Sequence, residues 1–161
     1  MNLMNNVQPE LIRIVLETDD TNVVIRELVQ ALEDAGAIDD CELICDMLRR
    51  SEKHYGTWAG LGGQMALPHL RTSHVDRLWL AIGVSQAGID WNALDGELVH
   101  VIFLFLMPPR SAPHMRWLEQ LGRVMIRESS FFDFLKQCSN PDDVYCLFQE
   151  AEEMLRDADE G

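Results

Sequence analysis

The chain has 161 residues, of which 47% are hydrophobic and 25% charged, and its formal net charge is −14. This length and composition fit one globular domain and argue against a disordered or fibrous chain. The charge argues against nucleic acid or anionic lipid as a partner, because such binding relies on Lys and Arg to neutralise phosphates.

The acidic residues gather near the two ends of the chain, most densely in Glu150 to Glu160. Solvated helix termini are the expected explanation for such runs, and docking of a partner is the alternative.

The first residues lack the basic and apolar regions of a signal peptide, and the most apolar run, Val101 to Met107, is too short to cross a bilayer. We therefore expect a cytoplasmic protein without direct membrane insertion, whose four cysteines are reduced thiols. Cys41 and Cys45 are spaced to share one helical face. This spacing favours two small side chains packed against a core and leaves a metal site as the lesser alternative.

The first part of the chain predicts one strand followed by two helices. Leu11 to Leu16 is a short apolar segment that predicts a strand. Thr21 is the candidate N-cap of a helix that ends at Gly36, and Asp39 caps a second helix with Arg49-Arg50 in its last turn. We expect these two helices to pair as a hairpin.

The middle of the chain predicts three strands after a glycine-rich loop. Gln64 to Leu67 forms the first strand. Arg77 to Ser85 alternates, with one face formed by Leu78, Leu80, Ile82 and Val84. Leu98 to Met107 is almost wholly apolar, as in a central strand covered on both faces, and Pro108-Pro109 end it.

The last part of the chain predicts three helices. The first has His114 in its first turn and an apolar face formed by Met115, Leu118, Gly122 and Met125. Ser130 begins a short second helix. Asn140 to Asp143 supplies an N-cap, a proline at the first helical position and two acids, and so begins a helix that reaches Leu155.

Helices before, between and after a few strands predict an α/β fold. The expected architecture is a three-layer α/β/α sandwich, in which helices flank a small mixed β-sheet. We expect one domain over residues 7–155, with flexible termini at residues 1–6 and 156–161.

His69 is the candidate functional side chain. The glycine-rich stretch Gly56 to Gly63 leads into the short apolar strand, and Pro68 stiffens the backbone directly before the histidine. This arrangement presents an imidazole at the end of a strand, which suits a reactive histidine better than one that fills a core. A structural histidine is the alternative.

Several enzyme classes lack their motifs. The chain has neither a G-x-S-x-G elbow nor a G-x-x-x-x-G-K-[ST] loop, and its glycines lack the strand and helix context of a dinucleotide site. No two of the five histidines show H-x-x-x-H or H-x-H spacing, so a metal hydrolase built on His69 and His114 is a weak alternative. A neutral imidazole can attack phosphorus directly, which favours a phosphoryl relay at His69.

Four segments follow the order of a known set of motifs. Gly60 to His69, preceded by Ala59, matches T-G-I-G-x-G-I-A-I-P-H, and Ile89 to Val99 matches I-x-W-x-x-x-D-G-x-x-V. Val101 to Pro108 matches an apolar strand that ends in proline, and His114 to Leu118 matches H-L-x-x-L. Over roughly residues 7–155 the chain therefore resembles enzyme IIA of the fructose/mannitol type, the phosphocarrier of the bacterial phosphoenolpyruvate-dependent sugar phosphotransferase system and its nitrogen-regulatory branch.

The resemblance implies that His69 accepts a phosphoryl group from the small histidine-containing phosphocarrier protein. The group then passes to a downstream enzyme IIB or regulated protein, or stays as a signal. His114 corresponds to the second active-site histidine and Arg50 to the arginine of an R-E pair, and both would support transfer. The N–H groups of the loop would cradle the phosphate, at Gly60, Gly62 and Gly63. No dissociable cofactor and no metal is implied.

The chain departs from the family pattern at three positions. Ala59 replaces the usual Thr, Gln64 the usual Gly, and Ser51 the usual Glu after Arg50. These departures leave open a second hypothesis, a binding module of the same fold that has lost phosphotransfer. Between the two active branches, a free-standing domain favours regulation over dedicated sugar uptake.

Overall fold

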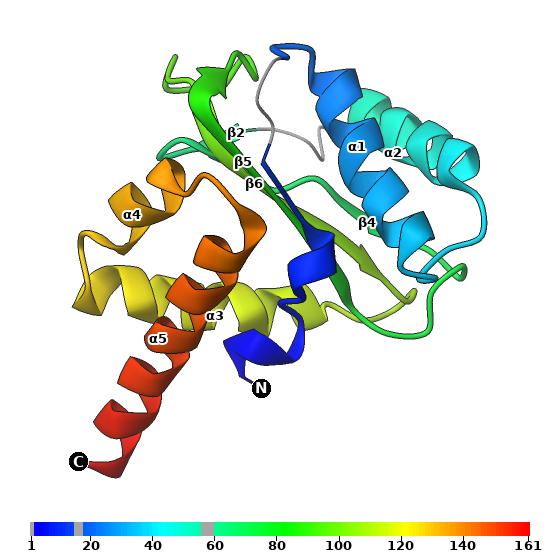
Figure 1. The fold of residues 1–161 in the computed structure, drawn as a ribbon. Coiled ribbons are helices and arrows are strands. Elements are labelled where there is room, and N and C mark those ends of the chain that lie inside the picture. Colours follow the sequence, from blue (N-terminus) through cyan, green and yellow to red (C-terminus); the bar gives the residue numbers. More distant parts are fainter. Residues whose placement is uncertain (1, 15–17, 56–59) are drawn as a thin grey trace.

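A six-stranded mixed sheet forms the middle of the protein (Figure 1). The computed structural model describes residues 2–14, 18–55 and 60–161, and at residues 53–55 and 60–62 it describes the backbone alone. The strands are β1 (Ile12–Ile14), β2 (Gly60–Gly62), β3 (Met65–Ala66), β4 (His69–Arg71), β5 (Trp79–Ile89) and β6 (Val99–Met107).

The two long strands, β5 and β6, are antiparallel and lie at the centre of the sheet. β1 pairs in parallel with the outer side of β5. β3 and β4 both pair in parallel with β6, one after the other along its length, and β2 runs antiparallel to β3. The mixed sheet expected from the sequence is confirmed.

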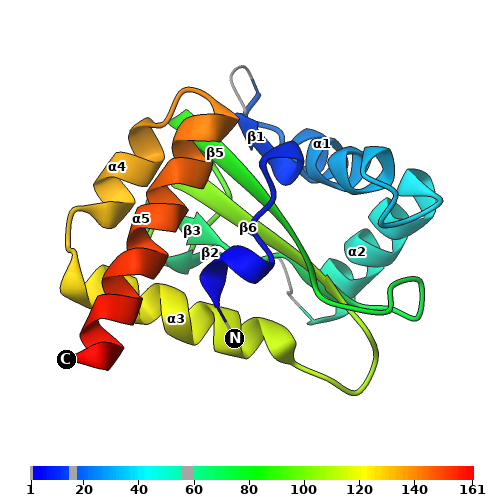
Figure 2. The ribbon, with the colours of Figure 1, turned by 60° about the horizontal axis from the view of Figure 1, so that its bottom comes forward.

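Within the described residues, five α-helices cover the two faces of this sheet. They are α1 (Thr21–Asp34), α2 (Cys41–Tyr55), α3 (Pro113–Arg127), α4 (Phe131–Gln137) and α5 (Pro141–Glu160), with short 3₁₀ turns at Leu3–Asn5 and Pro9–Leu11. The α1–α2 hairpin packs on one face and α3, α4 and α5 on the other (Figures 1 and 2), which confirms the three-layer α/β/α sandwich. No described helix combines the length and hydropathy needed to cross a bilayer.

The side-chain alternation of the central strands produces two separate cores. On β6, Phe103 and Phe105 face the α3–α5 layer, whereas Leu104 and Leu106 face the α1–α2 layer. Both faces of β6 are buried, and this explains why its sequence is apolar without interruption. The predicted apolar face of β5 also lies in the α3–α5 core, at Leu78, Leu80, Ile82 and Val84.

The helix α3 buries a different face from the predicted one. Its buried side chains are His114, Trp117, Leu121 and Val124. Met115, placed inside by the prediction, is 59% exposed. Two apolar stripes lie next to each other on this helix. The stripe with Trp117 is the inner one because its indole packs against Phe103 and Phe105 of the sheet.

Both N-caps of the first hairpin lie one residue away from their predicted positions. Asp20, not Thr21, caps α1 and accepts the N–H of the second helical residue at 2.9 Å. Asp40, rather than the predicted Asp39, accepts the N–H of the third residue of α2 at 3.1 Å. The helix α2 also continues to Tyr55, so the two arginines predicted in its last turn lie in its middle.

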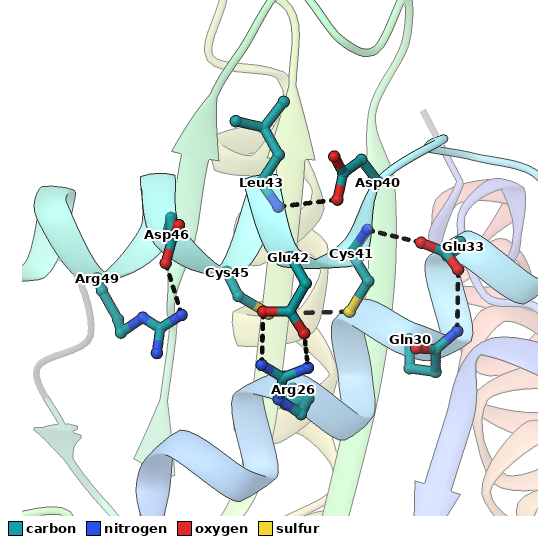
Figure 3. A network of polar contacts seen from close by, with 10 residues as sticks. All are labelled: Arg26, Gln30, Glu33, Asp40, Cys41, Glu42, Leu43, Cys45, Asp46 and Arg49. Carbon is teal, nitrogen blue, oxygen red and sulfur yellow. Dashed lines mark hydrogen bonds and ion pairs between the residues drawn. The ribbon is translucent and has the colours of Figure 1, made fainter.

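The contact between α1 and α2 joins an exposed ion pair to a buried pair of thiols (Figure 3). Arg26 of α1 donates to both carboxylate oxygens of Glu42 on α2. Beneath them the sulfur atoms of Cys41 and Cys45 lie 3.9 Å apart, and burial raises the pKa of Cys45 to about 12. These two residues therefore act as small packed side chains, as the favoured interpretation of their spacing predicts.

The described residues at both ends of the chain make specific contacts, although flexible ends were expected at residues 1–6 and 156–161. Leu3 is buried, and its carbonyl accepts the indole N–H of Trp117 at 3.0 Å. At the other end, α5 continues as a helix to Glu160. The flexibility of these two ends stays a prediction.

Candidate functional site

The approach to His69 is more regular than the predicted loop. Gly60–Gly62 forms the short strand β2, paired with β3, while residues 56–59 lie outside the described residues. After β3, the carbonyl of Pro68 accepts the N–H of Phe105 at 2.9 Å, and His69 then begins β4 beside β6. Pro68, which has no N–H of its own, thus lies between the short strands β3 and β4, both of which pair with β6.

The strand β4 directs its side chains alternately to the two layers. Leu70 points into the α1–α2 core and is buried. Because strand side chains alternate, His69 and Arg71 point to the opposite layer, the one containing α3. The first turn of α3 holds His114 in this same layer.

A hydrogen bond fixes the protonation of the His69 ring. Its Nδ1 lies 2.9 Å from the carbonyl oxygen of Leu67, which can only accept. Nδ1 therefore carries the proton, and in the neutral ring the lone pair is on Nε2. His69 is half-buried, so its ring is held in place without being sealed from solvent. This tautomer suits nucleophilic attack by Nε2.

His114 stacks on His69, with ring centroids 5.4 Å apart and an angle of 21° between the rings. The ring of Phe105, the neighbour of His69 in the sheet, also lies near His114, with ring centroids 5.6 Å apart. His114 is only 7% exposed, and within the described residues no hydrogen-bond partner reaches its Nδ1. Burial, followed by electrostatic interaction with His69 and Arg71, lowers the pKa of His114. The ring is therefore neutral at neutral pH.

Arg71 lies in the same layer as His69 and was not singled out from the sequence. Its Nε donates to the carbonyl of Ser111 at 2.9 Å, which attaches β4 to the segment before α3. Among the described residues no hydrogen bond or ion pair involves its terminal guanidinium nitrogens, and its charge acts on His114. The spacing of two residues from His69 on a strand was the signal that could have identified it.

Arg50, which the resemblance pairs with the active histidine, lies exposed on α2. Within the described residues no hydrogen bond or ion pair joins it to His69 or His114. Its supporting role stays a prediction.

The glycine loop carries its own constraints. Gly63 and Gln64 both adopt positive φ, at 64° and 68°. The N–H of Gly63 donates to a carboxylate oxygen of Asp95 at 3.0 Å, and this bond joins the glycine loop to the loop before β6. The side-chain oxygen of Gln64 accepts a bond from Lys136 at 2.8 Å. The cradle role of Gly60 and Gly62, whose backbone forms β2, stays a prediction.

In the part of the chain that the structure describes, no three His, Cys, Asp or Glu side chains come together as a metal-binding group.

A comparison with known families decides the affiliation of this chain. Residues 5–151 match the family described as "Phosphoenolpyruvate-dependent sugar phosphotransferase system, EIIA 2". The chain belongs to this family. The resemblance drawn from the four motifs is therefore confirmed, and the matched range includes both stacked histidines.

Curated relatives of this EIIA chain come from both branches of the system. It is 30% identical over 105 residues to the "PTS system fructose-specific EIIA component" of Haloferax volcanii, covering 65% of this chain and 67% of that protein. A "Nitrogen regulatory protein" of Pseudomonas aeruginosa is 31% identical over 107 residues, covering 66% and 63%. The "PTS system fructose-specific EIIABC component" of Bacillus subtilis is 29% identical over 118 residues, 73% of this chain, but this EIIA chain spans only 18% of that longer protein.

Solved structures show the same fold. A putative PTS IIA domain from Streptococcus pyogenes superposes with a TM-score of 0.76 at 23% identity, covering 95% of this chain and 97% of the other. The complex of enzyme IIA mannitol with phosphorylated enzyme IIB from Escherichia coli superposes with a TM-score of 0.71 at 16% identity, covering 90% and 98%. At these identities the likeness establishes the architecture of the EIIA chain.

Proposed function

We propose that this protein is a phosphocarrier in which Nε2 of His69 accepts a phosphoryl group from the histidine-containing phosphocarrier protein. The group then passes to an enzyme IIB or is held as a regulatory signal. The observation that supports this proposal best is the His69 ring itself. It is half-buried, held by the carbonyl of Leu67 in the tautomer with a free Nε2, and stacked on a second histidine.

The transfer forms a bond between phosphorus and Nε2 of His69 and breaks the bond between phosphorus and the donor's ring nitrogen. The electron pair of the broken bond stays on the donor. His69 then carries a positive ring that retains its proton on Nδ1, and the carbonyl of Leu67 stabilises this charge.

His114 and Arg71 would stabilise the transferred group. In the loose transition state of phosphoryl transfer the protein takes little part in bond making. Most of the catalysis therefore comes from positioned hydrogen-bond donors and from positive charge. The terminal nitrogens of Arg71 are available for this task. A dianion beside His114 favours protonation of that ring, which opposes the effect of its burial.

Two routes are open after phosphorylation of His69, namely transfer to an enzyme IIB in sugar uptake and use of the phosphoryl group as a regulatory signal. A fructose-specific component and a nitrogen regulatory protein match this chain at 30% and 31% identity, so relatedness supports both. The donor and receiving partner are part of the proposal.

The test is incubation with phosphoenolpyruvate, enzyme I and the histidine-containing phosphocarrier protein, followed by mass spectrometry that locates an acid-labile phosphate. We expect one phosphate on His69 in the wild type and none in His69→Ala. His74→Ala is the matched control, because His74 is exposed in the connection after β4 and should be labelled normally. An unlabelled wild type, or equal labelling of His69→Ala, would overturn the proposal.

A second candidate is a binding module that does not transfer phosphate. The bond from Gly63 to Asp95 supports it, because this bond places a carboxylate against the loop and uses an N–H expected to bind phosphate. The phosphomimetic variant His69→Asp separates the two functions. A regulator that reads phosphorylation should change its partner binding, whereas the module should bind the same partners with the same affinity.

A further inference from the structure

A hollow of about 200 Å³ lies between α3, α4 and α5. In Figure 2 these three helices lie side by side on the layer opposite α1 and α2. The hollow, here called the α3–α5 groove, has an apolar lining formed by Val124, Phe131, Phe134, Leu147, Ala151 and Met154. Val124 and Phe131 form its buried floor, while Phe134 is 56% exposed. The large aromatic side chain of Phe134 is therefore accessible to a partner at the edge of this apolar groove.

The size of the groove indicates what it can hold. Pockets for cofactors and drug-sized ligands measure about 300–1,000 Å³. A space of about 200 Å³ suits one or two large apolar side chains. A protein segment that inserts an anchor side chain fits this volume better than a small molecule, as when an amphipathic helix lies in a groove.

The charge around the groove selects the partner. Glu128 and Glu150 line it beside the apolar residues, and within the described residues neither of them takes part in an ion pair. The helix α5 carries eight acids and one base between residues 141 and 160, half of the formal net charge of −14. Glu152 is buried, and the other seven acids of α5 are exposed. Such a surface repels anionic lipid, nucleic acid and a second copy of this chain, and attracts a cationic partner.

We propose that the α3–α5 groove docks a basic amphipathic helix of a partner protein. An apolar side chain of that helix inserts beside Phe134, and flanking Lys or Arg side chains pair with Glu128 and Glu150. Val124 lies ten residues after His114 on α3. At the rise of an α-helix this separation is about 15 Å. Docking here therefore leaves His69 uncovered, and the inference goes beyond phosphotransfer.

The test uses three synthetic peptides and amide chemical shifts of the full chain. One peptide is a helix of Lys and Leu with Leu at i, i+3, i+4 and i+7. The second has the same composition without an apolar stripe, and the third has Glu in place of Lys. We expect the striped basic peptide alone to bind tightly, with shifts concentrated on residues 124–154. Equal binding of the unstriped peptide, or shifts centred on other elements, would overturn the proposal.

Two exposed apolar residues supply a matched pair of variants. Phe134→Ser should weaken binding of the striped peptide about 10-fold or more, since an anchor contact is lost. Ile126→Ser, on α3 but outside the groove lining and 85% exposed, should change the affinity less than about 2-fold. Unchanged affinity in Phe134→Ser would contradict the docking mode.

A second variant guards against a folding defect in the first. Glu128→Gln with Glu150→Gln keeps the shape of the groove and removes its two charges. We expect weaker binding and a smaller dependence of the affinity on salt, because screened ion pairs contribute less at high ionic strength. An unchanged salt dependence would show that the carboxylates do not face the peptide.

Discussion

Arg71 offers the sharpest test of the site at the scale of single residues. It shares one face of β4 with His69 and acts electrostatically on His114. We expect Arg71→Gln to slow phosphorylation of His69 about 10-fold or more, because a hydrogen bond to a charged group is lost in the transition state. Rapid-quench measurement of the transfer rate checks this prediction.

A second measurement on the same variant does not depend on phosphotransfer. The positive charge of Arg71 lowers the pKa of His114, so Arg71→Gln should raise that pKa, as followed by the ring proton shifts of His114. Arg127→Gln is the control, since Arg127 is exposed at the far end of α3 and should alter neither quantity. If both arginine variants behave alike, Arg71 is not part of the site.

Gln64 has an unfavourable backbone conformation, and a hydrogen bond of its side chain offsets part of the cost. Its φ of 68° suits glycine, and its side chain accepts a bond from Lys136. Gln64→Ala keeps the strain and loses the bond, so we expect the free energy of unfolding to fall by about 1 kcal/mol. Gln64→Gly relieves the strain as it loses the bond and should change the stability by less than about 0.5 kcal/mol. Urea unfolding of both variants checks the prediction, and an equal loss in both would contradict it.

At the scale of elements, the N-cap of α1 can be located by mutation. Asp20 accepts the N–H of Asn22, whereas Thr21 is already inside the helix. Asp20→Ala should lower the free energy of unfolding by about 1 kcal/mol, while Thr21→Ala should change it by less than about 0.5 kcal/mol. Thermal unfolding of the two variants measures both values. A larger loss in Thr21→Ala would restore the cap predicted from sequence.

The elements also show which structural features the sequence predicts well. The alternating apolar residues of β5 and the continuous apolar run of β6 predicted both strands, because a pattern over many residues depends little on any single residue. β4 spans only three residues, too few for a pattern, and exists because β6 offers it a partner. The inner face of α3 was mispredicted since two apolar stripes compete, and only the aromatic rings of the sheet select the one with Trp117.

At the scale of the whole molecule, His114 should make stability depend on pH. Burial lowers its pKa in the folded protein below the value of about 6.5 in the unfolded chain. The unfolded chain therefore binds more protons, and the contribution of His114 to stability falls as the pH decreases through about 6.5. Above that range this contribution is constant.

The variant His114→Gln removes this titration and keeps a polar side chain of similar size. We expect the melting temperature of the wild type to fall further between pH 8 and pH 5 than that of the variant, as followed by calorimetry. His74→Gln is the control, because His74 is exposed. Parallel profiles for the wild type and His114→Gln would show that His114 is not held neutral by the fold.

The sequence by itself determined the family and the α/β class, and it singled out His69 as the candidate functional side chain. Short motifs and the periodic spacing of apolar residues are local properties of the sequence, so they can be identified without the tertiary structure. Only the tertiary structure decided which atoms meet. Arg71 comes to the His69 layer by strand alternation, His114 becomes neutral by burial, and the N–H of Gly63 turns to Asp95. Such features arise from groups far apart in the chain, whose distances and solvation exist only once the layers have packed.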